Sequence, residues 1–308
     1  MAIQQVKAQI NGTWYTLALN SSTGKYEATI TAPTVTSYNV NSGHYYPITV
    51  EATNTAGTKT TVNDTTSGIG SSLQLVVKEK TKPTIAITSP GSGAFVTNSK
   101  QPIVFTLRDE TNGSGIKITT VALKIDSGTA ITSTSTGMVC TAVTGGYNCT
   151  YTPQTALSEG SHTVTINVSD NDGNSATQVS TTFKVDTVPP VLNVTSPTDN
   201  FITNNSSLVI SGTTNDSTSS PVTVTVSLNG MDTGAVTVGT NGSFSKTVTL
   251  ASGSNTIIVT STDTAGKSSS VTLKGTLDTS APTISAVSIT PNPTDVGGSV
   301  IISVTVMG

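Results

Sequence analysis

Few residues of this sequence have the types and spacing of a catalytic site. Its two histidines, His44 and His162, are far apart, and each precedes a strand-like run. No Gly-x-Ser-x-Gly elbow, His-Glu-x-x-His zinc motif or glycine-rich phosphate loop followed by a helix occurs. Hydrolysis by paired carboxylates needs no local motif and stays open. We therefore expect no catalytic residues and no enzyme.

Two cysteines have the spacing of a cross-strand pair. Cys140 and Cys149 flank a segment that turns near Gly145-Gly146. Cysteines that face each other on paired strands can form a disulfide if their Cβ atoms approach. A metal site is less favoured, because no third or fourth ligand lies nearby in the sequence. If the chain is made in a cytosol, these cysteines start reduced and oxidise after release.

One acidic segment has the oxygen density of a calcium loop. Asp170-Asn-Asp172-Gly-Asn174 lacks the glutamate that closes an EF-hand loop at its twelfth position. The corresponding segments elsewhere read Asn54-Thr-Ala-Gly57 and Asp263-Thr-Ala-Gly266. We therefore favour a hairpin turn over calcium binding by Asp170 and Asp172, and expect no metal and no cofactor.

The elements that must position these residues are strands. Val and Ile alternate with Thr and Ser, as in Val-Thr-Val-Thr-Val (222–226) and Val-Thr-Ile-Asn-Val (164–168). Side chains two residues apart share one face of a strand, so each run buries one face and exposes the other. No window has sustained helical periodicity, and the sequence predicts an all-β protein.

Charge and hydropathy exclude several classes of partner. The net charge is −3, and the 14 basic residues form no stripe of the kind that neutralises nucleic-acid phosphates. No apolar stretch approaches the length of a membrane span. The first residues lack a basic region followed by an apolar one, so no secretory signal is predicted. We expect neither nucleic acid nor membrane among the partners.

Internal repeats set the domain organisation. Residues 48–57, 164–173 and 257–266 superimpose without a gap, and each closes with glycine. These glycines are about 100 residues apart, the size of one immunoglobulin-like sandwich. Proline-led segments open the repeats at Lys82-Pro83 and Pro189-Pro190, with a third at Ala281-Pro282. Because proline fixes φ and donates no hydrogen bond, such joints favour an extended rod.

These openings and turns resemble bacterial immunoglobulin-like domains. The resemblance covers nearly the whole chain and implies tandem immunoglobulin-like β-sandwiches. The Ile-Asn-Gly-Thr-Trp-Tyr-Thr-Leu segment (10–17) and the ending Val-Ile-Ile-Ser-Val-Thr-Val (300–306) are similar to tail or virion-decoration proteins of phages that infect Gram-positive bacteria. That narrower resemblance implies a virion protein.

The third repeat predicts a full strand order from A to G. Its expected strands are Leu192–Ser196, Leu208–Thr213, Val222–Leu228, Ala235–Val238, Ser243–Leu250, Asn255–Thr262 and Ser270–Lys274. The first repeat starts at the equivalent of strand C, and the segment 283–306 matches strands A and B alone. We therefore predict an incomplete domain lacking strands A and B (1–80), two complete domains (81–187 and 188–279) and an A–B strand pair (280–308).

The two incomplete pieces are complementary parts of one sandwich. We hypothesise strand complementation, in which the A–B pair of one copy completes residues 1–80 of another copy. The assembly contacts predicted are Ile289, Val300, Ile302, Val304 and Val306. Such a contact is heterologous and builds a filament or a ring. Three alternatives stay open: a truncated chain, a smaller closed first domain, and completion by a different virion protein.

Aromatic residues gather near the start of the chain. Trp14 and five of the seven tyrosines lie within the first 46 residues. We predict that Tyr26, which aligns with Phe244, fills a core and that Trp14 and Tyr15 dock a partner or host-surface carbohydrate.

These features predict a non-enzymatic structural or adhesion component of a phage or phage-like tail. Its partners would be further copies of itself, head to tail, or another virion protein. The chain would be made in the bacterial cytoplasm and carried in the virion. Two alternatives are a bacterial cell-surface adhesin stalk and an accessory module of a secreted carbohydrate-active enzyme.

Overall fold

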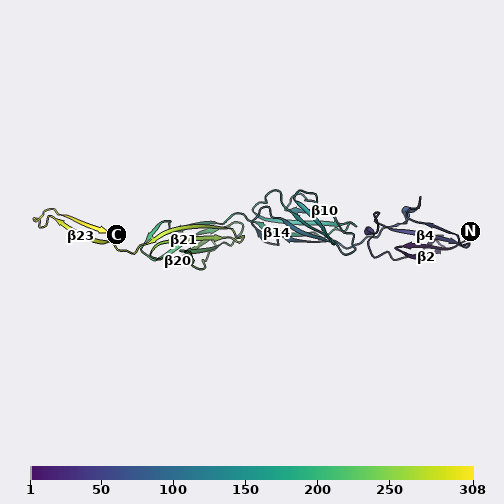
Figure 1. Cartoon of the computed structure of the whole chain (residues 1–308), viewed down its shortest axis with the longest axis horizontal. Helices are drawn as coiled ribbons and strands as arrows, with labels where there is room; N and C mark the ends of the chain where they lie inside the picture. Colours follow the sequence, from purple (N-terminus) through teal and green to yellow (C-terminus); the bar gives the residue numbers. More distant parts are fainter. Residues whose placement is uncertain (1) are drawn as a thin grey trace. The chain divides into compact units, whose positions relative to one another are not determined.

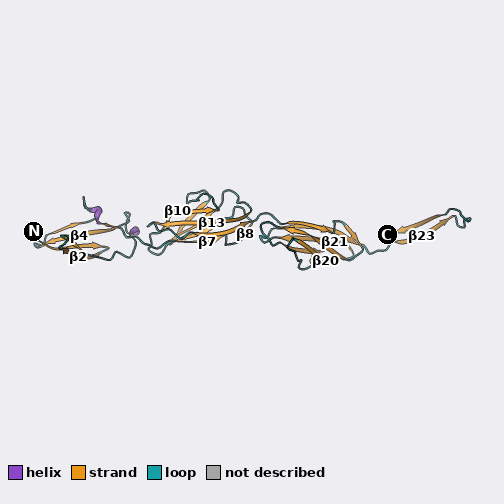
Figure 2. Ribbon diagram, turned by 180° about the vertical axis from the view of Figure 1, so that it is seen from behind, coloured by secondary structure: helices purple, strands orange, loops and turns teal. Residues whose placement is uncertain are grey.

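The computed structural model describes residues 2–308 and divides the chain into two compact units, which meet in sequence between Val185 and Asp186. Strands and loops make up nearly all of both units (Figure 2). The only helical segments of the described residues are two short 3-10 turns, Ser37–Asn39 and Gly70–Leu73. No helix in this part of the chain is long and apolar enough to cross a bilayer.

The first unit begins with a single antiparallel sheet in the order β3-β2-β1-β4-β5, to which β6 adds by pairing with β4. Its strands are β1 (Ile3–Ile10), β2 (Thr13–Asn20), β3 (Lys25–Glu27), β4 (Tyr46–Asn54), β5 (Lys59–Val62) and β6 (Gln74–Leu75). Asn11 and Gly12 connect β1 to β2 with positive φ values of 46° and 80°. This left-handed pair matches the twist of a two-residue hairpin.

The rest of the first unit consists of two sheets, ordered β10-β13-β14-β8 and β11-β12-β9-β7. Their strands are β7 (Thr84–Ser89), β8 (Ala94–Val96), β9 (Ile103–Arg108), β10 (Ile116–Ile125), β11 (Met138–Val143), β12 (Gly146–Tyr151), β13 (Gly160–Asp170) and β14 (Val179–Val185). Inward side chains of both sheets, among them Phe105, Ile166 and Phe183, form one fully buried core. The alternating apolar residues predicted from the sequence supply this core.

The second unit contains another pair of sheets, ordered β15-β17-β20 and β16-β22-β21-β18-β19, and a separate hairpin. The strands of the two sheets are β15 (Val191–Ser196), β16 (Phe201–Thr203), β17 (Ser207–Asn215), β18 (Thr223–Leu228), β19 (Met231–Asp232), β20 (Ser243–Thr249), β21 (Gly253–Thr262) and β22 (Ser268–Leu277). Ile210, Val226 and Ile257 lie in the core between them. The hairpin pairs β23 (Thr283–Thr290) with β24 (Ile301–Met307) (Figure 1).

Residues 84–185 and 191–277 are therefore immunoglobulin-like β-sandwiches in tandem, and the predicted all-β fold class is confirmed. One predicted strand is wrong. Ala235–Val238 makes only two isolated bridges, Val224–Val236 and Val238–Phe244. β16 was not predicted, and its three residues pair in parallel with β22. Such a short strand has no alternation of its own to reveal it.

Candidate functional site

The hairpin β23–β24 presents an uncovered apolar face. Residues opposite each other in an antiparallel pair lie on the same face, and here Val287 pairs with Val304 and Ile289 with Ile302. The apolar side chains on this face are Ile284, Val287, Ile289, Ile302, Val304 and Val306. Each is between 46% and 63% exposed. Val300, one residue before β24, continues the same alternation and is 41% exposed.

Four of the five predicted assembly residues thus share one face of the hairpin, and Val300 follows their alternation. Ile284 and Val287 were not among the predicted residues. Val287 follows the alternation from Ile289, whereas Ile284 reaches this face only through the register shift between Ile284 and Ala286. Both lie opposite predicted residues, since Ile284 pairs with Val306 and Val287 with Val304.

The same kind of strand pair occurs in both complete sandwiches, where its apolar face is covered by a second sheet. β7 pairs with β9 and β15 with β17, each with one register shift, as in the hairpin. In β9 the inward side chains Ile103, Phe105 and Leu107 are fully buried, because a second sheet covers them. In β24 the corresponding alternating row faces no second sheet within the described residues.

A matching apolar face lies on the first sheet, in residues 2–80. The register places Val6, Ala8, Ile10, Tyr15, Leu17, Leu19, Tyr26, Ile48, Val50, Ala52 and Val62 on one side of it. Tyr46 continues this row at the start of β4, and it is buried together with Ile10, whereas the other side chains of the face are half-buried or exposed. Residues 2–80 contribute this one sheet and no second sheet facing it. That residues 1–80 lack strands A and B stays a prediction.

The segment equivalent to strand E is largely unpaired in this first domain. In the second unit, β20 pairs with β17 along its whole length, with Phe244 opposite Gly212. The aligned segment around Tyr26 forms only β3, which pairs with β2 instead. Residues 28–31 that follow are in no strand. Their backbone has no neighbouring strand B with which to pair.

Trp14 and Tyr15 lie on opposite faces of the first sheet. Tyr15 belongs to the apolar face, opposite Ala8, whereas Trp14 lies on the polar face opposite Gln9. Lys7 Nζ lies 5.0 Å from the centre of the Trp14 ring and 3.3 Å from the Glu51 carboxylate. The two aromatic residues therefore do not form one docking patch, as the period of two in a strand dictates.

The hairpin β11–β12 brings the two cysteines together. Cys140 and Cys149 are directly opposite in its register and are joined by a disulfide in the structure. Cys149 packs in the sandwich core with 1% exposure. The bridge joins the strands of a short hairpin whose turn is Thr144-Gly145, one residue before the predicted Gly145-Gly146.

Asp170 and Asp172 serve as hydrogen-bond acceptors at a turn. Asp170 Oδ1 accepts from the backbone N–H groups of Gly173 (2.6 Å) and Asn174 (2.8 Å), and Oδ2 accepts from Asn174 Nδ2. Asp172 Oδ2 accepts from the Glu79 N–H at 3.1 Å and from Thr36. The acidic segment thus closes its own turn and contacts the preceding segments of the first unit.

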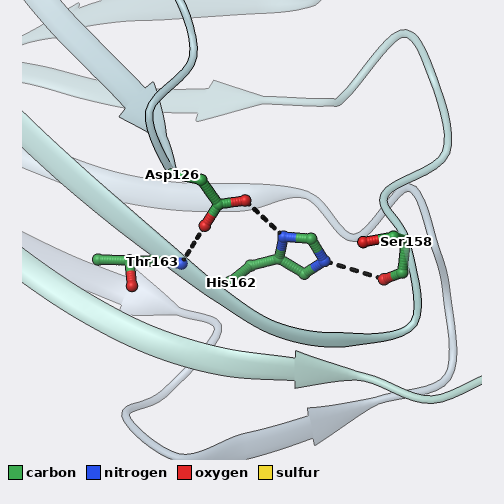
Figure 3. A network of polar contacts seen from close by, with 4 residues as sticks. All are labelled: Asp126, Ser158, His162 and Thr163. Carbon is green, nitrogen blue, oxygen red and sulfur yellow. Dashed lines mark hydrogen bonds and ion pairs between the residues drawn. The ribbon is translucent and has the colours of Figure 1, made fainter.

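His162 is the one buried histidine of the described residues. Nδ1 lies 2.8 Å from Asp126 Oδ2, and Nε2 lies 2.9 Å from the Ser158 carbonyl (Figure 3). Burial lowers the pKa of His162, but the hydrogen bonds to Ser158 and Asp126 outweigh it and leave the pKa raised. Burial raises the pKa of Asp126, yet the Thr163 N–H and His162 leave it lowered.

The same arrangement recurs in the next sandwich without a histidine. Asn255 occupies the repeat position of His162, and its Oδ1 accepts from Asn229 Nδ2 at 3.0 Å. Asn229 and Asp126 have nearly equal positive φ values, 53° and 52°. Each accepts from the backbone N–H that follows the repeat position, at 2.8 Å. The His162–Asp126 pair is therefore a turn-fixing contact, and Asp126 is the partner that the repeat alignment could have revealed.

Two family models match this chain. The model described as a bacterial Ig-like domain matches residues 88–187. The model described as glucodextranase domain B matches residues 190–279. Together they support immunoglobulin-like domains in both complete sandwiches. No curated protein matches the chain.

Solved structures with similar folds come from diverse proteins. Fibronectin(III)-like modules of Clostridium thermocellum CbhA share 17% identity over 63% of this chain and 94% of theirs, with a TM-score of 0.38. Three titin domains, I67–I69, share 14% identity over 90% and 88%, with a TM-score of 0.44. A bacterial ice-binding adhesin shares 23% identity over 90% and 88%, with a TM-score of 0.32.

Proposed function

We propose that this chain of immunoglobulin-like domains is a non-enzymatic structural protein that assembles by strand complementation. The β23–β24 hairpin of one copy would cover the apolar face of the first sheet of another copy. The observation that carries the proposal is that the A–B strand pair is covered by a second sheet in the complete sandwiches and is uncovered in the β23–β24 hairpin. Its inward side chains are fully buried in β9 and about half exposed in β24.

The proposed contact would bury the exposed apolar side chains and would also form backbone hydrogen bonds along a free strand edge. Face-to-face packing of two sheets removes the remaining exposed area of six β-branched side chains from water, and each contributes on the order of 1 kcal/mol. The free edge of β24 would pair with residues 28–31, as β17 pairs with β20. Backbone pairing supplies affinity and the alternating side chains supply specificity. A lone two-stranded hairpin is only marginally stable in water, and this contact would stabilise it.

Such an interaction joins two different surfaces of the chain, so it does not limit the assembly to a closed dimer. Repeated head to tail, it produces a filament, or a ring if the rotation returns to its start. A different protein with the same kind of ending would occupy the first sheet equally well. The two complete sandwiches would then act as spacers.

The biological setting that we propose is a phage or phage-like tail. The similarity of residues 10–17 and 300–306 to virion proteins supports this setting. A weak contact with host-surface carbohydrate through Trp14 fits the exposure of this residue, which is 42%. Immunogold labelling of purified particles with an antibody to the chain would locate it.

A second function is favoured by one specific observation. The match of residues 190–279 to glucodextranase domain B is compatible with an accessory module of a secreted carbohydrate-active enzyme. In that setting the chain would act beside a catalytic domain and would not need to form oligomers. The oligomeric state therefore separates the two functions.

The test uses charges on one face of the hairpin. Ile302→Asp with Val304→Asp places two carboxylates on the apolar face, whereas Ser303→Asp with Thr305→Asp places them on the opposite face of the same strand. We expect the mass of the wild-type protein to rise with concentration in multi-angle light scattering. The first variant should stay monomeric, because burying two carboxylates there has a high cost. The second should assemble like the wild type.

Two results would contradict the proposal. One is a wild-type chain that stays monomeric up to the highest soluble concentration. The other is assembly of the Ile302→Asp, Val304→Asp variant at wild-type concentrations, which would place the contact elsewhere on the molecule.

A further inference from the structure

Three aspartates that are distant in the sequence meet inside the second unit. Asp186 precedes β15, Asp216 directly follows β17 and Asp263 directly follows β21. One carboxylate oxygen of each lies within 4.8 Å of the others. All three residues are buried, with exposures of 0%, 9% and 6%.

The carboxylates are held by one oxygen each. Oδ1 of Asp186 accepts from the Val188 N–H at 3.2 Å, and Oδ1 of Asp263 accepts from the Lys267 N–H at 2.9 Å. The Oδ2 atoms of these two aspartates are buried and have no hydrogen-bond partner.

The third carboxylate is fixed in the same way. Oδ1 of Asp216 accepts from the N–H groups of Thr218 and Ser219, both at 2.7 Å. Among the salt bridges of residues 2–308, none involves any of the three aspartates. Backbone turns therefore orient the cluster, and no cationic side chain compensates its charge.

A buried carboxylate without a counter-charge is expensive, and three of them within 4.8 Å also repel one another. A bound cation removes both costs. An all-oxygen ligand set is typical of calcium and magnesium. Calcium binds oxygens at about 2.3–2.6 Å, so two of its ligands lie up to about 5 Å apart, whereas magnesium needs shorter distances and retains more water. We propose that Asp186, Asp216 and Asp263 bind a calcium ion.

The first unit has a related cluster. Asp109 directly follows β9, as Asp216 follows β17, and it lies near Glu79 and Glu110. Burial raises the pKa of Glu79, and the neighbouring Glu110 raises it further; burial also raises the pKa of Asp109. The three acidic residues of this first-unit cluster are half-buried, whereas the three aspartates of the second unit are buried. The repetition shows that acidic residues gather at the same position in both sandwiches, although the proposal rests on the second unit alone.

The test measures calcium binding by the full chain. Isothermal titration with calcium chloride gives the affinity, and calorimetric unfolding in calcium or in chelator gives the change in unfolding temperature. We expect calcium to raise the unfolding temperature of the second unit, and magnesium to have a smaller effect. Asp263→Asn and Asp186→Asn should each weaken calcium binding at this site at least tenfold, because one anionic ligand is lost.

Asn keeps the Oδ1 acceptor, so each variant should unfold in chelator at the wild-type temperature or above it. This outcome separates metal binding from a purely structural role, which would lower that temperature. The matched control is Asp278→Asn, an exposed aspartate that follows β22 and belongs to neither cluster. It should bind calcium like the wild type. Unfolding of the second unit that is unaffected by millimolar calcium, or that responds to calcium equally in Asp263→Asn, would overturn the proposal.

Discussion

His162 and Asn255 illustrate how polar residues at strand ends work in this protein. Both occupy the same repeat position, and both contact a left-handed residue, Asp126 or Asn229, that ends the neighbouring strand. The imidazole therefore replaces an amide in a recurring turn. Its chemistry adds one property that the amide lacks, namely a proton that can be lost near neutral pH.

We expect the stability of the sandwich formed by residues 84–185 to depend on the protonation of His162. The folded-state pKa of His162 is raised, so its contribution is fully present below the unfolded value, about 6.5, and is lost as pH rises through the folded value. Asp126 acts at the acidic end of the range because its pKa is lowered in the folded state. Its contribution to stability is present above about pH 4 and is lost as the pH falls through the folded-state pKa. The unfolding temperature should therefore fall as the pH rises above about 6.5.

Calorimetry of His162→Gln across this range provides the check. The variant should lose most of the pH dependence above pH 6, whereas His44→Gln should retain it, because His44 is exposed and stacks on Tyr38 outside that core. Equal pH profiles of wild type and His162→Gln would show that the pair does not couple protonation to folding.

At the scale of elements, the A–B strand pair occurs three times with one pattern and two outcomes. β7–β9 and β15–β17 each pack against a second sheet, and β23–β24 does not. Strand B also pairs with strand E in both complete sandwiches, through β12 and β20. In the hairpin, the corresponding edge of β24 is open.

The aligned register predicts a specific intermolecular neighbour. Ser211 lies opposite Ser245 in the β17–β20 pair, and Ser303 and Glu27 hold the equivalent positions in β24 and in the strand E segment. Directly opposite residues have Cα atoms at a distance that suits a disulfide. A chain with Glu27→Cys and Ser303→Cys should therefore form a ladder of covalent oligomers on a non-reducing gel.

Controls for this cross-link are available in the same chain. Each single variant should give at most a dimer. The variant with Ser270→Cys and Ser303→Cys should give no ladder, because Ser270 lies on β22 of a complete sandwich and outside the proposed contact, although it too is exposed. A ladder of equal intensity from this control pair would indicate random collisions and not the proposed pairing.

At the scale of the whole molecule, the two surfaces of the proposed contact lie in different units, so one copy presents both. A chain that ends before residue 280 keeps the first sheet and lacks the hairpin. It can accept a partner but cannot donate. Adding this truncated chain to the full-length protein should reduce the average mass in light scattering, because it ends each growing oligomer on one side.

The proportion of truncated chain sets the expected mass. Equal amounts should shorten the oligomers clearly, and an excess should leave mainly small species. An average mass that does not change with added truncated chain would argue against head-to-tail assembly. Incorporation of a labelled truncated chain into the small species is the accompanying control.

The sequence by itself determined the local features of this protein. Alternation predicted the strands, and the two cysteines that flank Gly145-Gly146 predicted the β11–β12 hairpin. The repeats predicted two complete sandwiches and the equivalence of Asn11-Gly12 with Asn229-Gly230, which share left-handed backbones. The prediction that Trp14 and Tyr15 dock together overlooked the same alternation, which puts adjacent residues of a strand on opposite faces. These features depend on residues close in the chain, where the period of a strand and the φ preferences of Asn and Gly act directly.

Only the tertiary structure decided which faces are covered and which distant residues meet. The exposed row of β24 has the same pattern as the buried row of β9, and a pattern cannot report whether a second sheet is present. Asp186, Asp216 and Asp263 belong to three separate strand ends, and each alone is typical of a turn. Their approach to within 4.8 Å depends on which loops the sandwich gathers at one end, which is a property of strand order and packing.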